Sequence, residues 1–488
     1  MAGSPIKFGT SGWRGIIADD FTFSNVRIAV AAIAEHVLSR KRTPTLLVAH
    51  DTRFFSEEFA RTAAVELSSR GVEPLLCFVA TPTPAVACEI RRRKIDGAIN
   101  FTASHNPAEY HGLKFSAADG GPALPEVTHD IEARAARLYA RTAERKASAF
   151  PSSHDAAAFE QVDVAPPYLA QLAELVRFSE LKTKAAPRIV YDALHGCGAG
   201  YLDRALAEHG VSGWETIRTQ RDVLFEGSGP DVSESNLKLL SETVVAQKAP
   251  HKSKIGLATD GDADRFGIVD ADGTWISPNH ILGLLYDYLI ESRGWKLDAA
   301  RSVATSHLLD AVAATHGRKV HETPVGFKYI GQLILKDAIA LGGEESAGLS
   351  IRGHVPEKDG ILACLLVAEM VAARQAPLDE QLRALFRRVG REYWPLRTNL
   401  HLPQEVKSRA VERLKSDFSE FLGRRVAQED RTDGLKLIFD DGSWILLRLS
   451  GTEPLMRVYT ETPSQAESAR LAEEARAWVF AAAAGGSR

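Results

Sequence analysis

The chain has 488 residues, enough for three or four domains of ordinary size. Hydrophobic residues make up 45% of it and charged residues 25%, a composition typical of folded globular proteins and not of disordered ones. The 59 basic and 63 acidic residues give a formal net charge of -4, so the charge balance gives no indication of nucleic-acid binding.

Targeting segments and cysteine chemistry also narrow the class of protein. The first residues lack the apolar core of a signal peptide, and apolar stretches such as residues 361–368 are too short to span a bilayer. The four cysteines stand apart without a C-x-x-C pair, which favours buried thiols over disulfides or a zinc site. We therefore expect a cytoplasmic protein that binds neither membranes nor nucleic acid. The cysteines are Cys77, Cys88, Cys197 and Cys364.

Taken in chain order, three segments repeat one pattern of elements. Each has an apolar strand, a polar loop, an amphipathic helix and a second strand that begins with glycine, in residues 45–78, 188–214 and 302–321. A strand, a helix and a strand in succession predict a right-handed parallel crossover unit. The recurrence of the unit indicates three related α/β domains.

The last quarter of the chain follows a different pattern. A helix near residues 404–421 precedes two apolar strands, 435–439 and 444–449, which a tight Asp-Asp-Gly turn joins into an antiparallel hairpin. An Ala/Glu-rich helix from Ser464 to about Ala484 follows. The predicted fold is therefore α/β, with three similar mixed α/β domains followed by a smaller α+β C-terminal domain. Polar stretches place the domains at 1–150, 151–253, 254–374 and 375–488.

The strongest motif is a run of three aspartates, Asp260, Asp262 and Asp264, after an apolar strand. At alternate positions of an extended segment their carboxylates lie on one side and can converge on a hard cation such as Mg²⁺ or Ca²⁺. An EF-hand is excluded, because Arg265 stands where that loop needs Gly and Ala271 where it needs Glu. A solvated acidic turn is the competing interpretation of this motif taken alone.

A second motif, S-H-N-P, ends the apolar strand that begins after Asp96. Strand ends are where α/β sheets present reactive groups, so Ser104 could be a nucleophile, with His105 polarising it or its substrate. Lys114 adds an acid or base that a nearby cation or phosphate would tune. A plain polar turn explains these residues equally well. A Ser-His hydrolase is disfavoured, because neighbouring side chains on an extended chain point apart and no G-x-S-x-G elbow is present.

Three further loops carry groups that suit sugar phosphates. One has hydroxyls, exposed amides and guanidinium groups that match phosphate geometry. Another has adjacent carboxylates and a hydroxyl in a flexible glycine-flanked loop, suited to vicinal sugar hydroxyls, and the third has an arginine between glycines. Each alone is as typical of a surface loop, but with a cation site and a hydroxyl nucleophile they fit phosphoryl transfer. The residues are Arg448, Ser450, Gly451, Thr452 and Arg457; Glu344 and Ser346; and Arg14.

Together these five motifs, in this order between Thr10 and Arg457, resemble those of the α-D-phosphohexomutases, the family of phosphoglucomutase, phosphomannomutase and phosphoglucosamine mutase. The T-A-S-H-N-P segment is similar to the family's phosphoserine loop, which implies a phosphorylated Ser104. The D-G-D-A-D-R segment is similar to its metal loop. This implies Mg²⁺ held by the three aspartates together with the phosphate on Ser104.

The resemblance also implies roles for the remaining site residues. Lys114 matches a general acid/base, with His105 beside the serine and Arg14 in the N-terminal active-site loop. The implied substrate contacts are Arg265 for phosphate; Glu344 and Ser346 for ring hydroxyls; Thr323, Gly326 and Lys358 for further substrate contacts; and Arg448, Ser450, Gly451 and Thr452, with Arg457 beyond, for the non-reacting phosphate. Two positions depart from the pattern: Ala263 replaces a usual Gly, which a negative φ would allow, and E-E-S-A-G replaces the E-M-S-G-H of many phosphomannomutase-type members.

As an enzyme of this family, the chain would be an intramolecular phosphotransferase that interconverts hexose 1-phosphate and hexose 6-phosphate. The implied sugars are glucose and/or mannose, and the implied intermediate and activator is a hexose 1,6-bisphosphate. Phosphoglucosamine mutase is the alternative, and E-E-S resembles the glucose-handling members. Two rivals stay open: a metal-dependent phosphatase that uses Asp260 and Asp262, and an inactive sugar-phosphate-binding regulatory protein. We expect a monomer or homodimer whose last domain rotates about a hinge near Arg374.

Overall fold

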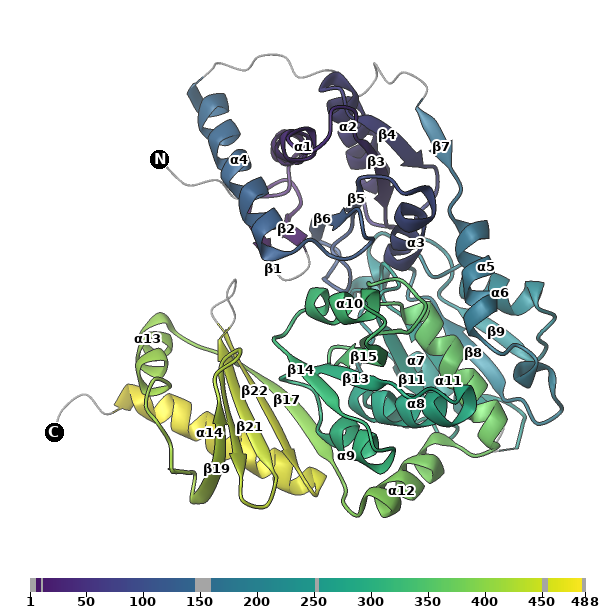
Figure 1. Ribbon diagram of the computed structural model, residues 1–488, viewed down its shortest axis with the longest axis vertical. Helices are drawn as coiled ribbons and strands as arrows, with labels where there is room; N and C mark the ends of the chain where they lie inside the picture. Colours follow the sequence, from purple (N-terminus) through teal and green to yellow (C-terminus); the bar gives the residue numbers. More distant parts are fainter. Residues whose placement is uncertain (1–5, 10–11, 145–158, 251–253, 450–454, 485–488) are drawn as a thin grey trace.

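The computed structural model describes residues 6–9, 12–144, 159–250, 254–449 and 455–484. The chain forms four units, each built on one sheet, and in Figure 1 they follow one another from the N-terminal unit at the top to the C-terminal unit at the lower left. The first three units are α/β and the fourth is α+β. This confirms the predicted fold class.

The first unit is a seven-stranded mixed sheet with four helices. Its strands are β1 (Phe8–Gly9), β2 (Gly12–Ile16), β3 (Thr45–His50), β4 (Glu73–Cys77), β5 (Gly97–Phe101), β6 (Tyr110–Ala117) and β7 (Glu160–Val162). Its helices are α1 (Phe23–Leu38), α2 (Ser56–Ser69), α3 (Thr83–Arg93) and α4 (Pro125–Glu144). The order is β1-β2-β6-β5-β3-β4-β7, and β3 pairs with β4 in parallel, which confirms the first crossover. Strand β7, which follows the predicted boundary at residue 150, pairs with β4 and completes this sheet.

The second unit is a five-stranded sheet in the order β12-β11-β10-β8-β9. Its elements are β8 (Arg188–Asp192), β9 (Trp214–Ile217), β10 (Lys254–Thr259), β11 (Phe266–Val269), β12 (Trp275–Ile276), α5 (Ala165–Leu175), α6 (Leu202–Glu208) and α7 (Lys238–Ala246). The parallel pair β8 and β9 confirms the second crossover. The predicted boundary between residues 253 and 254 is wrong, because β10 pairs with β8 and brings the three-aspartate loop into this unit.

The third unit is a four-stranded sheet in the order β14-β13-β15-β16. Its elements are β13 (Asp298–Ser302), β14 (Val320–Thr323), β15 (Ile339–Glu344), β16 (Gly348–Ile351), α8 (Pro278–Arg293), α9 (Leu308–Thr315), α10 (Phe327–Leu335), α11 (Gly360–Arg374) and α12 (Leu378–Val389). Parallel β13 and β14 confirm the third crossover. Helix α12 packs against α8 and α9, so the boundary predicted at residue 374 is also wrong. The link to the next unit is residues 390–393, which makes a hinge at Arg374 untenable.

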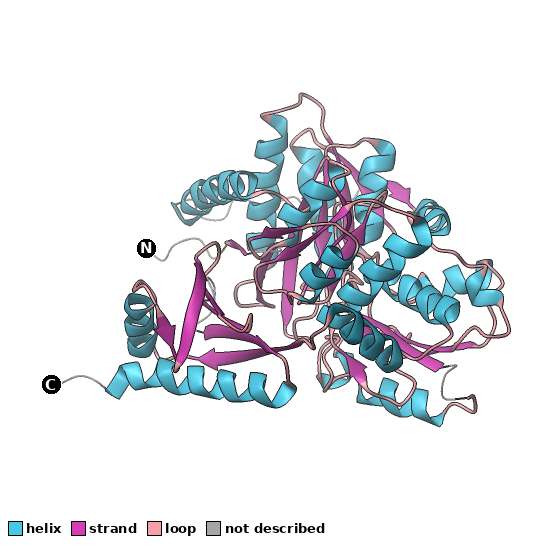
Figure 2. Ribbon diagram, turned by 60° about the horizontal axis from the view of Figure 1, so that its bottom comes forward, coloured by secondary structure: helices cyan, strands magenta, loops and turns pink. Residues whose placement is uncertain are grey.

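The fourth unit is an antiparallel sheet in the order β17-β22-β21-β20-β19-β18. Its elements are β17 (Trp394–His401), β18 (Glu420–Phe421), β19 (Arg424–Asp430), β20 (Leu435–Phe439), β21 (Trp444–Leu449), β22 (Leu455–Thr462), α13 (Gln404–Arg413) and α14 (Gln465–Ala484). The predicted hairpin is confirmed by the antiparallel pair β20 and β21. The C-terminal helix runs along one face of the sheet (Figure 2).

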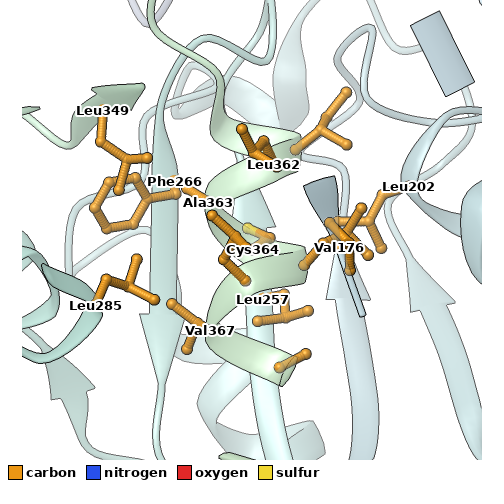
Figure 3. Packing of buried hydrophobic residues seen from close by; sticks show 14 of the residues in the cluster. Val176, Leu202, Leu257, Phe266, Leu285, Leu349, Leu362, Ala363, Cys364 and Val367 are labelled. Atoms are coloured by element: carbon orange, nitrogen blue, oxygen red, sulfur yellow. The ribbon is translucent and has the colours of Figure 1, made fainter. Parts of the chain in front are cut away.

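One hydrophobic core runs through the second and third units and reaches α3 of the first. Its centre is α11, which packs against β10 and β11 and is buried on all sides from Gly360 to Ala372; apart from Glu369 its buried residues are apolar, as such a helix requires. Figure 3 shows Cys364 and Val367 of this helix packed beside Leu257 and Phe266. Asp359 caps the helix by accepting from the Leu362 N–H at 2.8 Å. The second and third units are therefore joined by a shared core.

The fourth unit has a core of its own and meets the third through a small apolar cluster around Val303 and Trp444. Buried polar contacts complete this junction, among them the Lys436 ammonium, which donates to the Val303 carbonyl at 2.8 Å. Across the described residues no single helix is long and apolar enough to cross a membrane; α11 and α12 pass that test only as a pair bent by 79°.

Candidate active site

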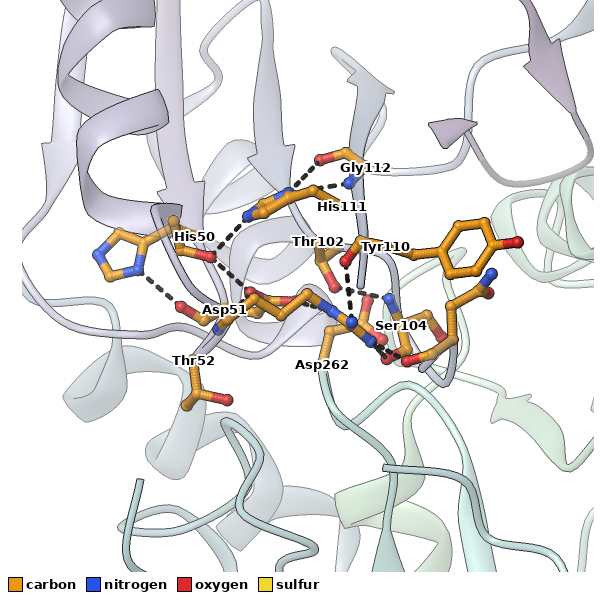
Figure 4. Close-up of polar contacts among 12 residues, drawn as sticks. His50, Asp51, Thr52, Thr102, Ser104, Tyr110, His111, Gly112 and Asp262 are labelled. Atoms are coloured by element: carbon orange, nitrogen blue, oxygen red, sulfur yellow. Dashed lines mark hydrogen bonds and ion pairs between the residues drawn. The ribbon is translucent and has the colours of Figure 1, made fainter. Parts of the chain in front are cut away.

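Ser104 lies in the loop between β5 and β6, at the end of the first sheet. Its side chain is buried, and its hydroxyl donates to the Asp260 carboxylate with 2.7 Å between Oγ and Oδ2. The backbone of Ser104 has φ +54°, and its N–H donates to Thr102 Oγ1 at 2.9 Å. The loop thus folds back on itself and aims the serine hydroxyl at the second unit, and Figure 4 shows Ser104 close to Thr102 and Asp262.

Opposite Ser104, between β10 and β11, lies the aspartate loop. One ligand oxygen from each of Asp260, Asp262 and Asp264 lies within 4.8 Å of the others. The carboxylates converge because the loop makes a turn, in which the Ala263 N–H donates to the Asp260 carbonyl at 2.9 Å, so the expected extended segment is wrong. Among the described residues, Oδ1 of Asp262 and Oδ1 of Asp264 are buried and have no hydrogen-bond partner. Such oxygens fit a hard divalent cation.

The backbone at Ala263 differs from the conformation expected when alanine replaces the usual glycine of the metal loop. Its φ is +56°, so the condition that this residue have a negative φ is not met. The side chain is fully buried and the residue accepts a hydrogen bond from the Gly360 N–H at 3.0 Å. The left-handed conformation is therefore imposed by the fold around it, at a cost that glycine would not incur.

Charges in the aspartate loop are unequal. Burial, followed by repulsion from Asp264 and Asp262, raises the pKa of Asp260 well above its usual range. Burial also acts to raise the pKa of Asp264, but Lys114, Lys358 and Arg265 outweigh it and hold that pKa well below the usual range. One carboxylate therefore faces ammonium groups, while at the carboxylate that meets Ser104 the nearby Arg265 does not outweigh burial and repulsion.

Two lysines from different units meet this loop. Lys114, on β6, donates to Asp262 at 2.5 Å and to Asp264 at 2.8 Å. Burial lowers its pKa, but the two carboxylates outweigh burial and raise the pKa above the usual value, so this amine is an ammonium. Lys358, from the third unit, lies 3.0 Å from Asp264 and 3.0 Å from Glu357. Segments from three units therefore converge on the aspartates.

Further positive charge surrounds Ser104. The Arg14 guanidinium, on β2, donates to Asn106 Oδ1 at 2.6 Å, and Arg265 lies at the end of the aspartate loop. Burial and then the nearby Arg265 and Arg14 lower the pKa of His105 well below its usual value, so its imidazole is neutral. Ser104 Oγ and His105 Nδ1 are 3.3 Å apart. The expectation that these neighbours point apart is wrong, because Ser104 is not extended.

Glu344 and the segment around Gly326 lie together in the third unit. Glu344 accepts from the Gly326 N–H at 2.7 Å, next to Thr323 at the end of β14. Burial and then the neighbouring Glu345 raise the pKa of Glu344 to about 7. The predicted flexible loop is instead a tight turn between antiparallel β15 and β16, with Ser346 half-buried within it. The turn fixes a carboxylate and a hydroxyl at one edge of the sheet.

Arg448 and Arg457 stand opposite each other on β21 and β22 of the fourth unit. Arg448 Nε donates to Asp433 Oδ1 at 2.9 Å, and the second oxygen of Asp433 accepts from the Val325 N–H of the third unit at 3.0 Å. Paired guanidinium groups on adjacent strands suit an anion. The remaining predicted residues of this loop, Ser450, Gly451 and Thr452, lie outside the described residues.

Comparison with known proteins accounts for the four units. Family models described as phosphoglucomutase/phosphomannomutase match in chain order: alpha/beta/alpha domain I over residues 5–142, domain II over 166–273, domain III over 277–389 and the C-terminal domain over 398–477. A phosphoglucomutase/phosphomannomutase of Thermococcus kodakarensis is 30% identical over 465 residues, which cover 95% of this chain and 96% of the relative. The chain belongs to the phosphoglucomutase/phosphomannomutase family.

Relatives in this family carry different sugars in their names. A phosphoglucosamine mutase of Acidothermus cellulolyticus is 29% identical over 480 residues, covering 97% of this chain and 95% of the relative. A crystal structure from Thermus thermophilus, provisionally named a phosphomannomutase, has a TM-score of 0.83 at 32% identity and covers 98% of this chain and 100% of that one. Family members are phosphomutases, isomerases that transfer a phosphoryl group intramolecularly, and this confirms the predicted family and enzyme class.

Sequence reasoning missed two buried residues of this candidate site. Arg53 donates to backbone carbonyls of the Ser104 loop, and Thr83, at the start of α3, donates its hydroxyl to the Asp262 carboxylate. Neither stands in a motif with other reactive groups. An arginine after a strand and a threonine between prolines read as ordinary loop residues, so only the folded arrangement reveals them.

Proposed function

We propose that this chain is a phosphosugar mutase that interconverts hexose 1-phosphate and hexose 6-phosphate through a phosphorylated Ser104. The observation that carries the proposal is the 2.7 Å hydrogen bond from Ser104 Oγ to Asp260. It joins a buried hydroxyl of the first unit to a carboxylate cluster of the second, and two oxygens of that cluster have no hydrogen-bond partner among the described residues. A phosphoryl group on this oxygen would lie among Arg14, Arg265 and the aspartate loop.

In the first transfer, the bond from phosphorus to the Ser104 oxygen breaks and a bond from phosphorus to the free sugar hydroxyl forms. The sugar hydroxyl loses its proton and the leaving Ser104 oxygen gains one, so that a free serine hydroxyl and a hexose 1,6-bisphosphate result. The second transfer is the reverse at the other end of the sugar: Ser104 Oγ takes the other phosphoryl group and the sugar oxygen regains a proton. The bisphosphate must therefore turn around between the two steps, and added bisphosphate would act as the activator.

Lys114 is the proposed acid/base of both transfers. Each transfer needs one group that gives and takes a proton beside the reacting oxygens, and Lys114 contacts the same carboxylate cluster as Ser104. The three aspartates and the Ser104 phosphate would hold Mg²⁺, which would supply positive charge beside the phosphoryl group in transfer. His105, neutral and 3.3 Å from Ser104 Oγ, can donate to or accept from a phosphoryl oxygen but carries no charge.

The proposed substrate contacts divide between the third and fourth units. Glu344, Ser346, Thr323, Gly326 and Lys358 would contact the sugar, while Arg448, Arg457 and residues 450–452 would bind the phosphate that is not reacting. We propose glucose and/or mannose phosphate as the substrate, with glucosamine phosphate as the alternative. The names of the relatives include all three sugars. Four buried cysteines without disulfides support a cytoplasmic location.

Replacing Ser104 tests the central step. Intact-mass and peptide measurements should find phosphate on Ser104 of the wild type and none on Ser104→Ala. Mutase turnover should fall by about 10⁴-fold or more on every sugar phosphate, because the covalent route is lost. The assay contains glucose, mannose or glucosamine 1-phosphate with catalytic bisphosphate and Mg²⁺. Ser116→Ala, a buried serine on β6 outside the site, is the matched control and should keep both phosphate and turnover.

Each rival predicts a different outcome of the same assays. A metal-dependent phosphatase would release inorganic phosphate without isomerising the sugar. A regulatory binding protein would bind sugar phosphate without turnover, and its Ser104 would carry no phosphate. Normal mutase turnover in Ser104→Ala would remove the proposed mechanism.

A further inference from the structure

Arg53 is a completely buried arginine at the end of β3, beneath the Ser104 loop. A charged side chain in such a place requires a full set of partners. Its Nε donates to Asp51 Oδ2 at 3.1 Å, and its backbone N–H donates to Asp51 Oδ1 at 2.9 Å. The aspartate thus supplies the opposite charge and fixes the plane of the guanidinium.

The other four N–H groups of this guanidinium all donate to backbone carbonyls of the loop that carries Ser104. A guanidinium has five N–H donors, so every donor of the Arg53 side chain is used. No lysine could repeat the pattern, because its single nitrogen has three donors. The four acceptors are the carbonyls of Ser104 at 2.7 Å, Asn106 at 2.5 Å, Pro107 at 2.7 Å and Tyr110 at 3.0 Å.

Three of these carbonyls belong to the loop before β6, outside the sheet, and the Pro107 carbonyl also accepts from the Tyr110 N–H at 3.1 Å. Ser104 has φ +54°, a left-handed conformation that a residue with a side chain adopts only when its surroundings impose it. Arg53 binds the Ser104 carbonyl, while the Ser104 hydroxyl donates to Asp260 of the second unit. The arginine therefore sets the direction of the reacting oxygen without touching it.

Asp51 is itself held in place. Its Oδ1 accepts from the Ser56 hydroxyl at 2.6 Å, and Ser56 Oγ lies 3.0 Å from His111 Nε2. Figure 4 shows the side chains of Asp51 and His111 on one side of this network and the ring of Tyr110, the neighbour of His111, on the other. The support for the loop thus runs from α2 and β6 through Asp51 to Arg53.

Residues of the second unit also contact Arg53. The guanidinium carbon lies 5.0 Å from the centre of the Phe225 ring. Arg221 donates to the carbonyl of Thr52 at 2.9 Å and to that of Arg53 at 3.1 Å. The same buried group therefore contacts the serine loop and the unit that carries the aspartates.

We infer that Arg53 is a positioning residue that clamps the backbone of residues 104–110 and so holds the Ser104 oxygen at the aspartate cluster. The inference rests on the proposed function for its effect on turnover. Its structural part, the clamped loop, can be measured independently. The clamp acts on the transfer step and leaves the groups proposed to contact the sugar unchanged.

Arg53→Lys is the test variant, because it keeps the positive charge and removes the planar guanidinium with its five N–H donors. Its kcat should fall by about 100-fold, the effect of misplacing a reacting atom by about 1 Å. KM for the sugar phosphate should stay within about threefold of the wild type. Hydrogen–deuterium exchange at the amides of residues 104–110 should become faster. Arg137→Lys, an arginine on α4 that pairs with Glu35, is the matched control and should change none of these.

Several results would overturn the inference. One is a folded Arg53→Lys protein with kcat within about threefold of the wild type and unchanged exchange at residues 104–110. Another is a kcat loss that disappears when the assay is run far below the thermal midpoint, since that would indicate only general destabilisation. Should Arg53→Lys not fold, Asp51→Asn keeps Arg53 and weakens its anchor. It should lower kcat more than it changes KM, and an unchanged kcat would overturn the inference.

The two proposals fail in different ways. Full turnover in Ser104→Ala would refute the phosphoserine mechanism whatever Arg53 does. Faster exchange at residues 104–110 in Arg53→Lys would still confirm the clamp in that case. Exchange at residues 104–110 that stays slow in Arg53→Lys, together with an inactive Ser104→Ala, would refute the clamp and leave the phosphoserine mechanism intact.

Discussion

Thr83 and Asp262 are joined by two hydrogen bonds although 179 residues separate them in the chain. The Thr83 N–H donates to the Asp262 carbonyl at 2.9 Å, and the Thr83 hydroxyl donates to the Asp262 carboxylate. The same hydroxyl accepts from the Asn100 amide at 2.9 Å. The start of α3 in the first unit thus orients one carboxylate of the second, and leaves its other oxygen for a cation.

Replacing Thr83 by Val should therefore weaken cation binding. The substitution keeps the shape and the backbone bond but removes the hydroxyl that orients Asp262. Loss of such an outer partner costs about 10- to 100-fold in metal affinity. Isothermal titration with Mg²⁺, in protein without substrate, measures it directly. Thr128→Val on α4, whose hydroxyl donates to the Pro125 carbonyl, is the control. Equal affinities in the two variants would contradict the role of Thr83.

Glu344 should make substrate binding depend on pH near neutrality. Burial and Glu345 raise its pKa to about 7, so its carboxylate loses charge as the pH falls below that value. An ionised carboxylate accepts stronger hydrogen bonds from sugar hydroxyls than a protonated one. KM should therefore rise below about pH 7 in the wild type and less so in Glu344→Gln. The phosphate of the substrate also titrates, but equally for both proteins, so the ratio of their KM values isolates Glu344.

The same group should affect stability with a defined sign. Between the usual value of 4.5 and about 7, folded Glu344 keeps a proton that the unfolded chain has released. The free energy of unfolding therefore falls as the pH rises through this window and is level above it. Glu344→Gln does not titrate, so it should gain stability relative to the wild type as the pH rises from about 4.5 to about 7. Parallel thermal midpoints of the two proteins across this range would rule this out.

Much of the site could be predicted because its reactive groups stand in short segments. Ser104 with His105, and the three aspartates, each occupy one loop, so their chemistry is visible before the fold is known. Arg53 could not be found in this way, because its partners are carbonyls of a loop about fifty residues along the chain. Chemistry that lies in backbone groups leaves no pattern of residue types.

The fold, like the site, was predictable only where its elements are contiguous in the chain. Crossover units follow from local order, since each strand, helix and strand is contiguous. The boundary predicted after residue 253 was misplaced because β10 pairs with β8, and the boundary at residue 374 because α12 packs on α8. A polar stretch of sequence gives no indication of such long-range contacts. Ala263 shows the same limit at one residue, where the turn of the aspartate loop imposes a left-handed backbone that composition does not reveal.

Ala263 should tolerate replacement by glycine better than an ordinary buried alanine. A left-handed backbone costs a residue with a side chain about 1–2 kcal/mol, and glycine avoids that cost. Ala258 on β10 is the matched control, because it is equally buried and lies in an extended strand. Both substitutions lose one methyl group and gain unfolded-state freedom. Chemical denaturation should find Ala258→Gly more destabilising than Ala263→Gly by about 1–2 kcal/mol, and equal losses would mean that Ala263 is unstrained.

Arg448 should contribute to binding and not to phosphorylation of Ser104. Its guanidinium stands on the fourth unit beside Arg457, and Asp433 ties it to the Val325 N–H of the third. Arg448→Ala removes charged hydrogen bonds worth about 1.5–3 kcal/mol, so KM for the sugar phosphate should rise by about 10- to 100-fold.

Two further measurements separate this role from others. Intact mass should show the same phosphate on Ser104 in Arg448→Ala as in the wild type, because the serine lies in the first unit and Arg448 in the fourth. Arg425→Ala, an exposed arginine on β19, should leave KM unchanged. A loss of Ser104 phosphate, or unchanged kinetics in Arg448→Ala, would count against Arg448 as a ligand of the non-reacting phosphate. Arg448 would then serve, through Asp433, only the contact between the fourth and third units.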